Sequence, residues 1–250
     1  MWSPPRARST LMMRVFAALG CSVLDEPFYA YWLKALDKRD DPGFAETLAA
    51  HESEPQKIIE QLLATPNNSG DWIYQKHMAI HMLPEVDLSW MSDSSFVHCF
   101  LIRDPREVIA SMTEFRDLQT ICATQGPEAA AALVGIPQLN RIYKTVVDLG
   151  QQPVVLDANS VLADPSLVLK AFCDRVGLPF DPQAEISWVP GQHPTDGAWA
   201  PFWYQKIFHT STLKPRNSQI PSVPATLQAV VDVCMPTYEL LYRQRVAGEV

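Results

Sequence analysis

The sequence predicts an α/β fold of three layers, in which a central, mostly parallel sheet carries helices on both of its faces. Along the chain, short apolar stretches of strand length alternate with longer amphipathic stretches of helix length. The stretch 96–102 is apolar at nearly every position, as expected for a central parallel strand that is buried on both faces. The 250 residues contain no internal repeat and no low-complexity tract, so we expect a single domain over residues 1–250.

Each element predicted in the first half of the chain follows from its local pattern. Apolar residues recur all round the first helix, and the second strand ends in the polar residues Asp25 and Glu26. Pro55 lies near the first turn of the predicted helix 55–64 and marks its start. The predicted elements are helix 11–19, strand 22–24, helices 44–50 and 55–64, and strand 72–78.

The second half continues the alternation of strands and helices. Arg103-Asp104-Pro105 ends the central strand, and a long alanine-rich stretch predicts a helix that runs to about residue 147. Asp164 caps the next helix and Gly177 stops it. Residues 181–224 are rich in proline and aromatic residues without a period, which predicts ordered loops. The remaining predicted elements are helix 107–115, strand 153–157, helix 165–176 and helix 226–245.

The composition excludes several classes of function. A net charge of -8 and a pI near 5.2 oppose a general attraction to nucleic acid or to an anionic membrane, because both need a wide basic surface. No segment approaches the roughly 20 apolar residues of a membrane span, and Arg14 interrupts the apolar stretch that a signal peptide would need. Five scattered cysteines without a Cys-x-x-Cys pair predict reduced core thiols in a cytoplasmic protein and no metal site.

A loop rich in cations and hydroxyls lies immediately ahead of the first predicted helix. Arg6 and Arg8 provide positive charge, and Ser9 and Thr10 provide hydroxyl donors. The helix start adds unpaired backbone N–H groups and the positive end of the helix dipole. This combination suits a phosphate or a similar anion. The alternative is that Ser9 or Thr10 simply caps the helix while both arginines are solvated.

A second cationic site follows the predicted central strand. Arg103 stands at the carboxyl end of that strand, and Ser111 lies two turns into the next helix. In open α/β sheets this edge is where ligands bind. The alternative is structural: Arg103 pairs with Asp104 or Glu107, and Ser111 is a neutral helix residue.

Three stretches carry a resemblance to a known family. They are Pro5-Arg6-Ala7-Arg8-Ser9-Thr10, the stretch Arg103-Asp104-Pro105-Arg106-Glu107-Val108-Ile109-Ala110-Ser111, and Leu162-Ala163-Asp164-Pro165 with its helix and the sequel Val176-Gly177-Leu178-Pro179-Phe180. In order and spacing they resemble the sulfotransferases that use 3′-phosphoadenosine 5′-phosphosulfate (PAPS), whose α/β fold carries a P-loop-like anion-binding loop. By this resemblance, the donor's 5′-phosphosulfate would be bound by Arg6, Ala7, Arg8, Ser9 and Thr10, and its 3′-phosphate by Arg103 and Ser111.

The chain also departs from the family's pattern. Arg8 stands where many members have glycine, which adds charge and removes the freedom for unusual backbone angles. Only Met1-Trp2-Ser3 precedes the loop, so the opening strand is nearly missing. The family's glycine-rich C-terminal phosphate loop has no clear counterpart.

Several residues are candidates for the chemical step. Lys76 and His77 lie near the end of strand 72–78, where the family often has a lysine and a histidine; Lys76 would stabilise charge and His77 would act as the base. The side chains of neighbouring residues on a regular strand point to opposite faces, so Lys76 and His77 do not both point towards the site. Glu26 is the second candidate base, and His81 is a further one. The alternative is that both histidines are hydrogen-bonded core residues.

These observations predict a cytoplasmic enzyme that transfers a sulfuryl group from PAPS to a hydroxyl or amine of a small-molecule acceptor. A sulfuryl group carries less charge than a phosphoryl group, so neither magnesium nor another metal is expected. Nucleic acid and membrane are not expected partners, and the sequence leaves the oligomeric state open. The alternatives are a P-loop-type nucleotide-dependent phosphotransferase, which the missing Gly-Lys-Ser/Thr ending disfavours, and a non-catalytic nucleotide-binding module of the same fold.

Overall fold

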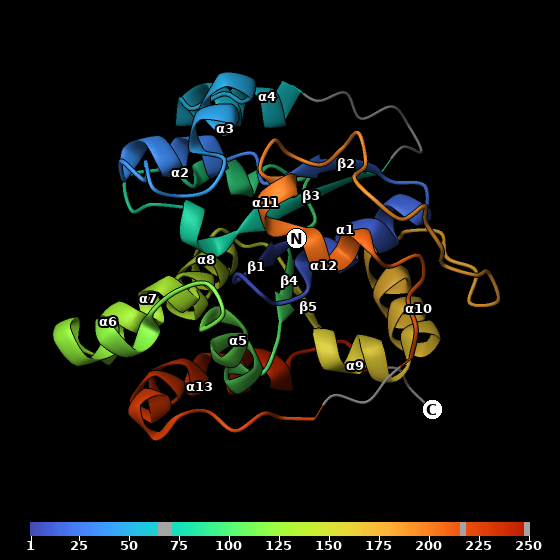
Figure 1. Ribbon diagram of the computed structural model, residues 1–250. Coiled ribbons are helices and arrows are strands. Elements are labelled where there is room, and N and C mark those ends of the chain that lie inside the picture. Colours follow the sequence, from blue (N-terminus) through green and yellow to red (C-terminus); the bar gives the residue numbers. More distant parts are fainter. Residues whose placement is uncertain (65–71, 216–218, 248–250) are drawn as a thin grey trace.

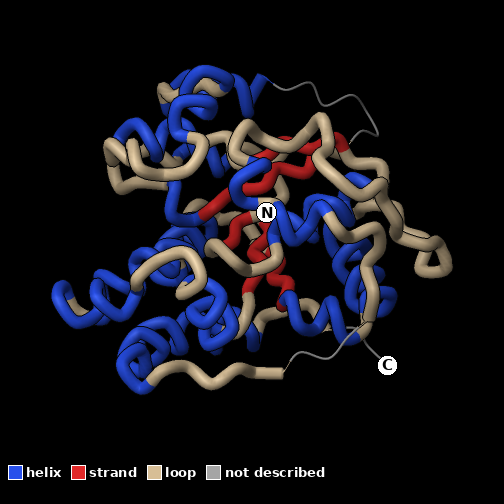
Figure 2. Tube along the Cα trace, viewed as in Figure 1, coloured by secondary structure: helices blue, strands red, loops and turns tan. Residues whose placement is uncertain are grey.

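The central sheet confirms the predicted α/β class. The computed structural model describes residues 1–64, 72–215 and 219–247. Within these residues the sheet has five strands in the order β2-β3-β1-β4-β5, and every pairing is parallel. Figure 2 shows the strands in the middle of the molecule with helices on both sides. The strands are β1 (Trp2–Ser3), β2 (Ser22–Asp25), β3 (Ile73–Met78), β4 (Cys99–Ile102) and β5 (Val154–Asp157).

Helices cover the sheet on both faces (Figure 1). Helices α1 (Ser9–Ala18), α9 (Ala158–Ala163) and α10 (Pro165–Val176) pack on one face, where Leu101 and Leu156 point. Helices α4 (Pro55–Ala64), α8 (Ile136–Asp148) and α13 (Gln228–Arg243) pack on the other face, against Phe100 and Val155. Neighbouring residues of β4 and β5 thus serve opposite cores, which is why these strands are apolar at every position but one.

The remaining helices lie around the edges of these layers. Helix α5 follows β4 directly, with Asp104 accepting a hydrogen bond from the Arg106 backbone N–H as the N-cap. A third apolar core joins α5, α7 and α13. The bounds are α2 (Tyr29–Ala35), α3 (Phe44–Ala50), α5 (Pro105–Met112), α6 (Leu118–Gln125), α7 (Pro127–Val134), α11 (Ala200–Trp203) and α12 (Gln205–Phe208).

The central strand and the long alanine-rich helix differ most from their predicted bounds. The strand expected over residues 96–102 is β4, which begins only at Cys99, because residues 96–98 lie ahead of the paired region. The long helix expected up to residue 147 is broken into α6, α7 and α8. Gly126 and Gly135 adopt φ values of 92° and 86° at these breaks, and a proline follows each of them within two residues.

A buried ion pair anchors the loop region that follows α10. Arg14 of α1 makes a bidentate contact with Asp196, with both N–O distances at 2.6 Å, and both side chains are at most 1% exposed. The contact fixes the segment that leads into α11 and α12 against the first helix. These two short helices interrupt the predicted loop 181–224, of which residues 216–218 lie outside the described residues.

No helix among the described residues is both long enough and apolar enough to cross a membrane.

Candidate functional site

The loop between β1 and α1, residues Pro4–Arg8, is hereafter the anion loop. Arg6 and Arg8 adopt left-handed backbone angles, with φ values of 63° and 67°. The sequence suggested that Arg8 removes this freedom, but the structure places Arg8 itself in the glycine-like conformation, at a cost of roughly 1 kcal/mol. No side chain caps α1. The first N–H groups of this ten-residue helix therefore remain available to an anion, and the simple capping alternative is not what the structure shows.

Contacts to Glu107 and Asn159 hold Arg8 in this conformation. Arg8 Nη2 lies 3.2 Å from Glu107 Oε1, and Arg8 Nη1 donates to Asn159 Oδ1. Asn159 Nδ2 donates in turn to Glu107 Oε2, at 2.5 Å. Glu107 is only 4% exposed, and its contacts with Arg8 and Asn159 compensate its buried charge.

Arg103 and Ser111 meet the anion loop, although about 100 residues separate them from it along the chain. Arg103 Nη1 donates to the backbone carbonyl of Arg6 at 2.7 Å, and Arg103 Nη2 lies 3.1 Å from Glu107 Oε1. Arg6 Nε donates to Ser111 Oγ at 3.0 Å, and its guanidinium lies over the Phe115 ring. The pairing of Arg103 with Glu107 that the sequence left open is therefore present, and Arg103 contacts the anion loop at the same time.

These residues open into a cavity of about 720 Å³. It is large enough for a nucleotide, since ligand pockets commonly range from about 300 to 1,000 Å³. Ala7 is fully buried in the core on the α1 face, so only its backbone belongs to the anion loop. The predicted site residues that line the cavity are Arg6, Arg8, Ser9, Thr10, Glu26, Lys76, Arg103 and Ser111.

A buried cluster of charges forms the second wall of the cavity. Lys76 Nζ lies 2.5 Å from Glu26 Oε1 and 3.0 Å from Asp25 Oδ1, and it also contacts the Tyr204 hydroxyl. The Tyr204 hydroxyl lies 2.8 Å from Asp25 Oδ2. Lys76 is 1% exposed. Burial lowers the pKa of Lys76, but Asp25 and Glu26 outweigh this and raise that pKa above its ordinary value, so the ammonium form is kept.

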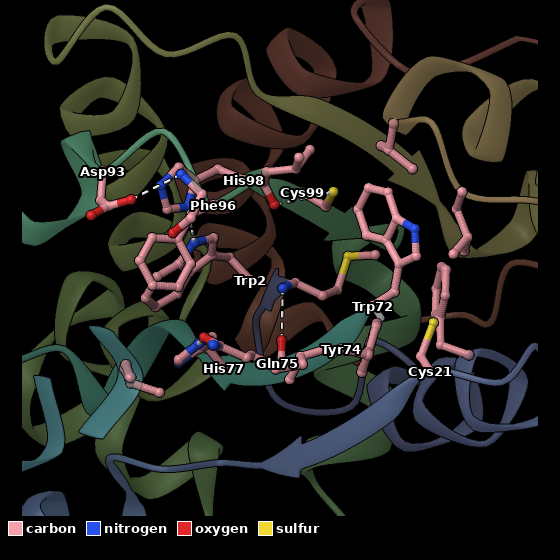
Figure 3. Close-up of a pocket in the computed structure, with 18 of the residues that line it drawn as sticks. Trp2, Cys21, Trp72, Tyr74, Gln75, His77, Asp93, Phe96, His98 and Cys99 are labelled. Atoms are coloured by element: carbon pink, nitrogen blue, oxygen red, sulfur yellow. Dashed lines mark hydrogen bonds between the residues drawn. The ribbon is translucent and has the colours of Figure 1, made fainter. Parts of the chain in front are cut away.

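The structure separates His77 from Lys76. Lys76 faces the cavity of the anion loop, whereas the ring of His77 stacks on Trp2 at 4.3 Å and its Nε2 lies 3.1 Å from Gln75 Oε1. His77 instead lines a second cavity, which Figure 3 shows. The alternation expected of neighbouring strand residues therefore holds, and His77, which was named as the base, is the one of the two that lies outside the cavity of the anion loop.

His81 takes the place near the cavity that the sequence analysis assigned to His77. It follows β3 in a short 3₁₀ turn (Ala79–His81), lines the cavity of the anion loop, and places Nδ1 3.9 Å from Glu26 Oε2. Burial lowers the pKa of His81 well below its ordinary value, and the nearby Lys76 charge lowers it further. The imidazole is therefore neutral at pH 7.

Aromatic side chains from the α11 region line the rest of the cavity. Trp199, Trp203 and Tyr204 all contribute to its wall. Phe202, which lies between them in the sequence, does not line it and is 42% exposed.

The sequence reasoning missed several residues that hold the site together. Asn159 and Asp25 stand at or just after strand carboxyl ends, which is the signal that could have found them. Glu107 appeared only as a structural alternative for Arg103. Tyr204 had no such signal, because 128 residues separate it from Lys76.

Among the described residues, no group of three or more His, Cys, Asp or Glu side chains is arranged to hold a metal ion. The polar groups that line the cavity include arginine guanidiniums, hydroxyls, carboxylates and the buried ammonium of Lys76.

A five-stranded, all-parallel sheet with helices on both faces, and a loop between β1 and α1 that contacts Arg103 at the end of β4, defines an α/β domain. The chain belongs to the sulfotransferase family, because the family model described as "Sulfotransferase domain" matches residues 1–245. The resemblance of the three sequence stretches to sulfotransferases is thereby confirmed.

Similar proteins include two from Arabidopsis thaliana, named branched-chain-amino-acid aminotransferase-like proteins 2 and 1. They are 28% and 29% identical to this chain over 241 residues, which is 96% of this chain and 40% of each relative. The chain thus spans about two fifths of the length of these relatives. A solved structure, the sulfotransferase domain from the curacin biosynthetic pathway, aligns at a TM-score of 0.47 and 16% identity, covering 94% of this chain and 95% of that one.

Proposed function

We propose that this protein transfers a sulfuryl group from PAPS to a hydroxyl or amine of a small-molecule acceptor. The observation that carries the proposal is the meeting of Arg6, Arg103 and Ser111 at the uncapped start of α1. Two cationic stretches that are distant in the sequence thereby face one cavity, as the donor's two anionic ends require. The match to the sulfotransferase family supports the same chemistry.

The donor's 5′-phosphosulfate is assigned to the anion loop. Arg6, Arg8, Ser9 and Thr10 all line the cavity, and the backbone N–H groups at the uncapped start of α1 would add donors for an anion there. Arg103 and Ser111 are assigned to the 3′-phosphate. Arg103 Nε is buried and has no hydrogen-bond partner among the described residues, so it offers a further donor for that phosphate.

The chemical step is an in-line transfer at sulfur. The acceptor oxygen or nitrogen forms a bond to sulfur, the bond between sulfur and the bridging oxygen of the 5′-phosphate breaks, and 3′,5′-adenosine bisphosphate leaves with that electron pair. The acceptor's proton passes to a base on the protein. Lys76 is the cation at the second wall of the cavity, and we assign to it the stabilisation of charge on the transferring and bridging oxygens.

We assign the base to Glu26 rather than to His77. Glu26 lines the cavity and is held by Lys76, with His81 next to it, whereas His77 faces the other cavity. The neutral His81 ring would help to orient the Glu26 carboxylate. Its Nδ1 lies 3.9 Å from Glu26 Oε2 and has no hydrogen-bond partner among the described residues.

The acceptor and the cellular location complete the proposal. The aromatic rings of Trp199, Trp203 and Tyr204 give the acceptor end of the cavity an apolar wall, which suits a small molecule with an apolar body. All five cysteines are free thiols, and four of them are buried, which supports a reducing, cytoplasmic environment.

Calorimetric titration with 3′,5′-adenosine bisphosphate tests the donor site. We expect micromolar binding by the unmodified chain, a loss of at least tenfold in Arg103→Ala, and no binding of ATP at the same concentrations. Lys170→Met is a matched control, because that cation is exposed on α10 and pairs with Asp174 one turn away. A folded protein that ignores the bisphosphate would sink the donor assignment, and equal affinity for ATP would favour a nucleotide-dependent phosphotransferase.

A further inference from the structure

Asp25 and Glu26 are neighbours in the chain, yet both contact the ammonium of Lys76. On a regular strand their side chains would point to opposite faces of the sheet. Strand β2 ends at Asp25, and Glu26 adopts a left-handed backbone conformation with a φ of 40°. This break in the strand allows both carboxylates to reach Lys76, with Asp25 Oδ1 at 3.0 Å and Glu26 Oε1 at 2.5 Å from Nζ.

The two carboxylates differ in their access to the cavity of the anion loop. Glu26 lines this cavity, whereas Asp25 does not line it and has a side chain that is 1% exposed. Asp25 therefore lies out of contact with a substrate in the cavity. Any effect of Asp25 on a reaction there must pass through its neighbours Lys76 and Glu26.

The hydroxyl of Tyr204 distinguishes the two carboxylates further. Its oxygen receives N–H groups from Lys76 and from Trp199, and a hydroxyl has a single proton to donate. That oxygen lies 2.8 Å and 2.9 Å from the two carboxylate oxygens of Asp25, and 3.2 Å from Glu26 Oε1. The shorter distances place the proton of Tyr204 in the hydrogen bond to Asp25.

Asp25 thus accepts more hydrogen bonds than Glu26. Its donors are the Lys76 ammonium, the Tyr204 hydroxyl and the backbone N–H of Gly197, the last at 3.1 Å. Among the described residues, Lys76 is the donor that remains for Glu26. Burial raises the pKa of Asp25, and the charge of Lys76 and the N–H of Gly197 oppose that rise. Several donors suit Asp25 to stay an anion, whereas a single donor leaves Glu26 able to take up a proton.

We propose that Asp25 is a positioning residue for the transfer reaction, and that its negative charge offsets the charge of Lys76 at Glu26. An ammonium 2.5 Å from a carboxylate favours the ionised form of that carboxylate, so Lys76 alone would make Glu26 a poor base. Asp25 shares this ammonium and also repels a second negative charge, and both effects favour proton uptake by Glu26. The part in catalysis rests on the proposed function, whereas the electrostatic effect does not.

The other titratable groups in contact with Glu26 are neutral at pH 7. His81 Nδ1 lies 3.9 Å from Glu26 Oε2, and burial and the Lys76 charge keep the pKa of His81 well below its ordinary value. Burial, with the charges of Asp25 and Glu26, raises the pKa of Tyr204 well above its ordinary value. Neither ring can therefore offset the charge of Lys76.

Tyr29 and an ion pair lie next along the wall of the cavity. Burial raises the pKa of Tyr29, on α2, and the charges of Glu26 and Asp41 raise it further, so this phenol is neutral as well. Asp41 is paired with Arg116, whose Nη2 lies 2.8 Å from Asp41 Oδ1. The charge of Asp41 is therefore already compensated, which leaves Asp25 as the anion that shares the ammonium of Lys76 with Glu26.

Asp25→Asn tests the proposal, because it keeps the shape of the side chain and removes its charge. The readout is the carboxyl carbon-13 NMR signal of Glu26, followed against pH in the free protein and assigned by its absence from Glu26→Gln. We expect the pH midpoint of this signal to fall by at least about one unit in Asp25→Asn. Asp157→Asn is the matched control and should leave the midpoint unchanged, since Asp157 is also buried at the end of a strand but does not line the cavity.

Tyr204→Phe keeps the proposal testable if Asp25→Asn fails to fold. The ring remains, but Asp25 loses its hydroxyl donor, takes up a proton more readily and offsets less of the Lys76 charge. We expect the midpoint of Glu26 to move in the same direction by a smaller amount. An unmoved or raised midpoint in folded Asp25→Asn, or in Tyr204→Phe if the first variant does not fold, would overturn the proposal.

The pH profile of turnover connects this effect to the reaction. With PAPS and a set of alcohols, phenols and amines as acceptors, kcat should begin to rise at a lower pH in Asp25→Asn, in step with the NMR midpoint. Its plateau should fall several-fold, because Glu26 is then a weaker base. A shifted midpoint with an unmoved pH profile would overturn the positioning role. A shifted midpoint without turnover in any form would support the electrostatic effect of Asp25 and contradict the proposed function.

Discussion

Glu26 and His77, the two candidate bases, line different cavities. Glu26 follows β2 and lines the cavity of the anion loop, whereas His77 of β3 lines the second cavity. Glu26→Gln keeps the shape of the side chain and removes its ability to accept a proton. We expect it to lower turnover by about 10²- to 10⁴-fold with little change in the affinity for 3′,5′-adenosine bisphosphate.

His77→Gln is the matched variant, and it should retain turnover within a few fold. The measurement is the release of 3′,5′-adenosine bisphosphate from PAPS in the presence of a panel of alcohols, phenols and amines. Loss of turnover in His77→Gln but not in Glu26→Gln would reverse the assignment of the base. Turnover by neither the unmodified chain nor the variants, with donor binding intact, would identify a non-catalytic nucleotide-binding module.

Buried histidines make the stability of the protein depend on pH. Burial lowers the pKa of His77 well below its ordinary value, and the charge on the Met1 amino group lowers it further. The unfolded chain therefore takes up the proton first, below about pH 6.5, while the folded protein stays neutral there. The free energy of unfolding should fall between pH 7 and pH 5, by up to about 1.4 kcal/mol per pH unit for each such histidine.

Urea unfolding at several pH values checks this expectation. His81 and His98 also have lowered pKa values because of burial, so they add to the slope. His77→Gln should reduce the slope between pH 7 and pH 5. A slope that His77→Gln does not alter would mean that this ring is already protonated or exposed in the folded state.

At the residue scale, the sequence predicted positions better than it predicted contacts. Arg6, Arg103 and Ser111 could be assigned to one sheet edge, because loops and helix starts at the carboxyl ends of parallel strands meet there. The ring stack of His77 on Trp2 could not be predicted, because it depends on which face β3 turns towards β1. The contact of Tyr204 with Lys76 joins segments whose approach depends on the loops in between.

At the scale of elements, one turn connects helix packing to the anion loop. Gly135, between α7 and α8, has a φ of 86°, and a Cβ there would lie 2.6 Å from Ile80 and 2.9 Å from Pro5 of the anion loop. Gly150 also has a positive φ, of 78°, but nothing lies within 4 Å of the position that a Cβ would take there. A Cβ would therefore be strained by the backbone angle at both positions, but it would be crowded by neighbouring atoms only at Gly135.

Gly135→Ala and Gly150→Ala form a matched pair. Each should cost about 1 kcal/mol through the left-handed backbone, and Gly135→Ala should cost a further 1–3 kcal/mol through overpacking. Because the displaced neighbour is Pro5, only Gly135→Ala should also weaken the binding of 3′,5′-adenosine bisphosphate. Chemical denaturation and calorimetry measure the two effects. Equal losses of stability and affinity in both variants would show that the crowding at Gly135 relaxes without moving the loop.

The elements themselves were largely predictable where a cap or a proline marks them. Helix 165–176 was predicted with the bounds of α10, because Asp164, Pro165 and Gly177 mark both of its ends. The breaks in the alanine-rich stretch were missed, although a glycine with a proline one or two residues later marks both of them, at Gly126-Pro127 and at Gly135-Ile136-Pro137.

For the whole molecule, donor binding should appear as thermal stabilisation. The protein carries a net charge of -8, so its affinity for an anionic nucleotide must come from the local arginines. At a concentration 100 times the Kd, 3′,5′-adenosine bisphosphate should add about 2.7 kcal/mol, or roughly 5–11 °C in Tm. ATP at the same concentration should add little, and thermal scans with both nucleotides make the comparison.

Glu107→Gln sharpens the same measurement. This substitution leaves Arg8 and Arg103 without their shared negative partner, so the free protein should melt several degrees lower. The bound nucleotide then replaces the negative charge that Glu107 supplied to the two guanidiniums. The rise in Tm on adding the nucleotide should therefore be larger in Glu107→Gln than in the unmodified chain. Glu46→Gln, an exposed position on α3, is the control. A smaller shift in Glu107→Gln would show that its carboxylate positions the arginines for the nucleotide rather than competing with it.

The order of the strands is a property of the whole molecule that the sequence did not provide. Alternating strands and helices predicted a parallel sheet, but several orders satisfy that pattern. In the observed order, β1 lies between β3 and β4, which brings Lys76 and Arg103 to either side of the anion loop.

The hydrogen bond from Arg103 to the Arg6 carbonyl joins the two ends of the assigned donor site. A group that binds Arg103 therefore also acts on the backbone that holds the opposite end of the same nucleotide. It follows that a donor lacking the 3′-phosphate differs from PAPS in the alignment of its sulfur as well as in its residence time. Discrimination against such a donor would then extend to the rate of the chemical step, because a small misplacement of reacting atoms slows transfer steeply.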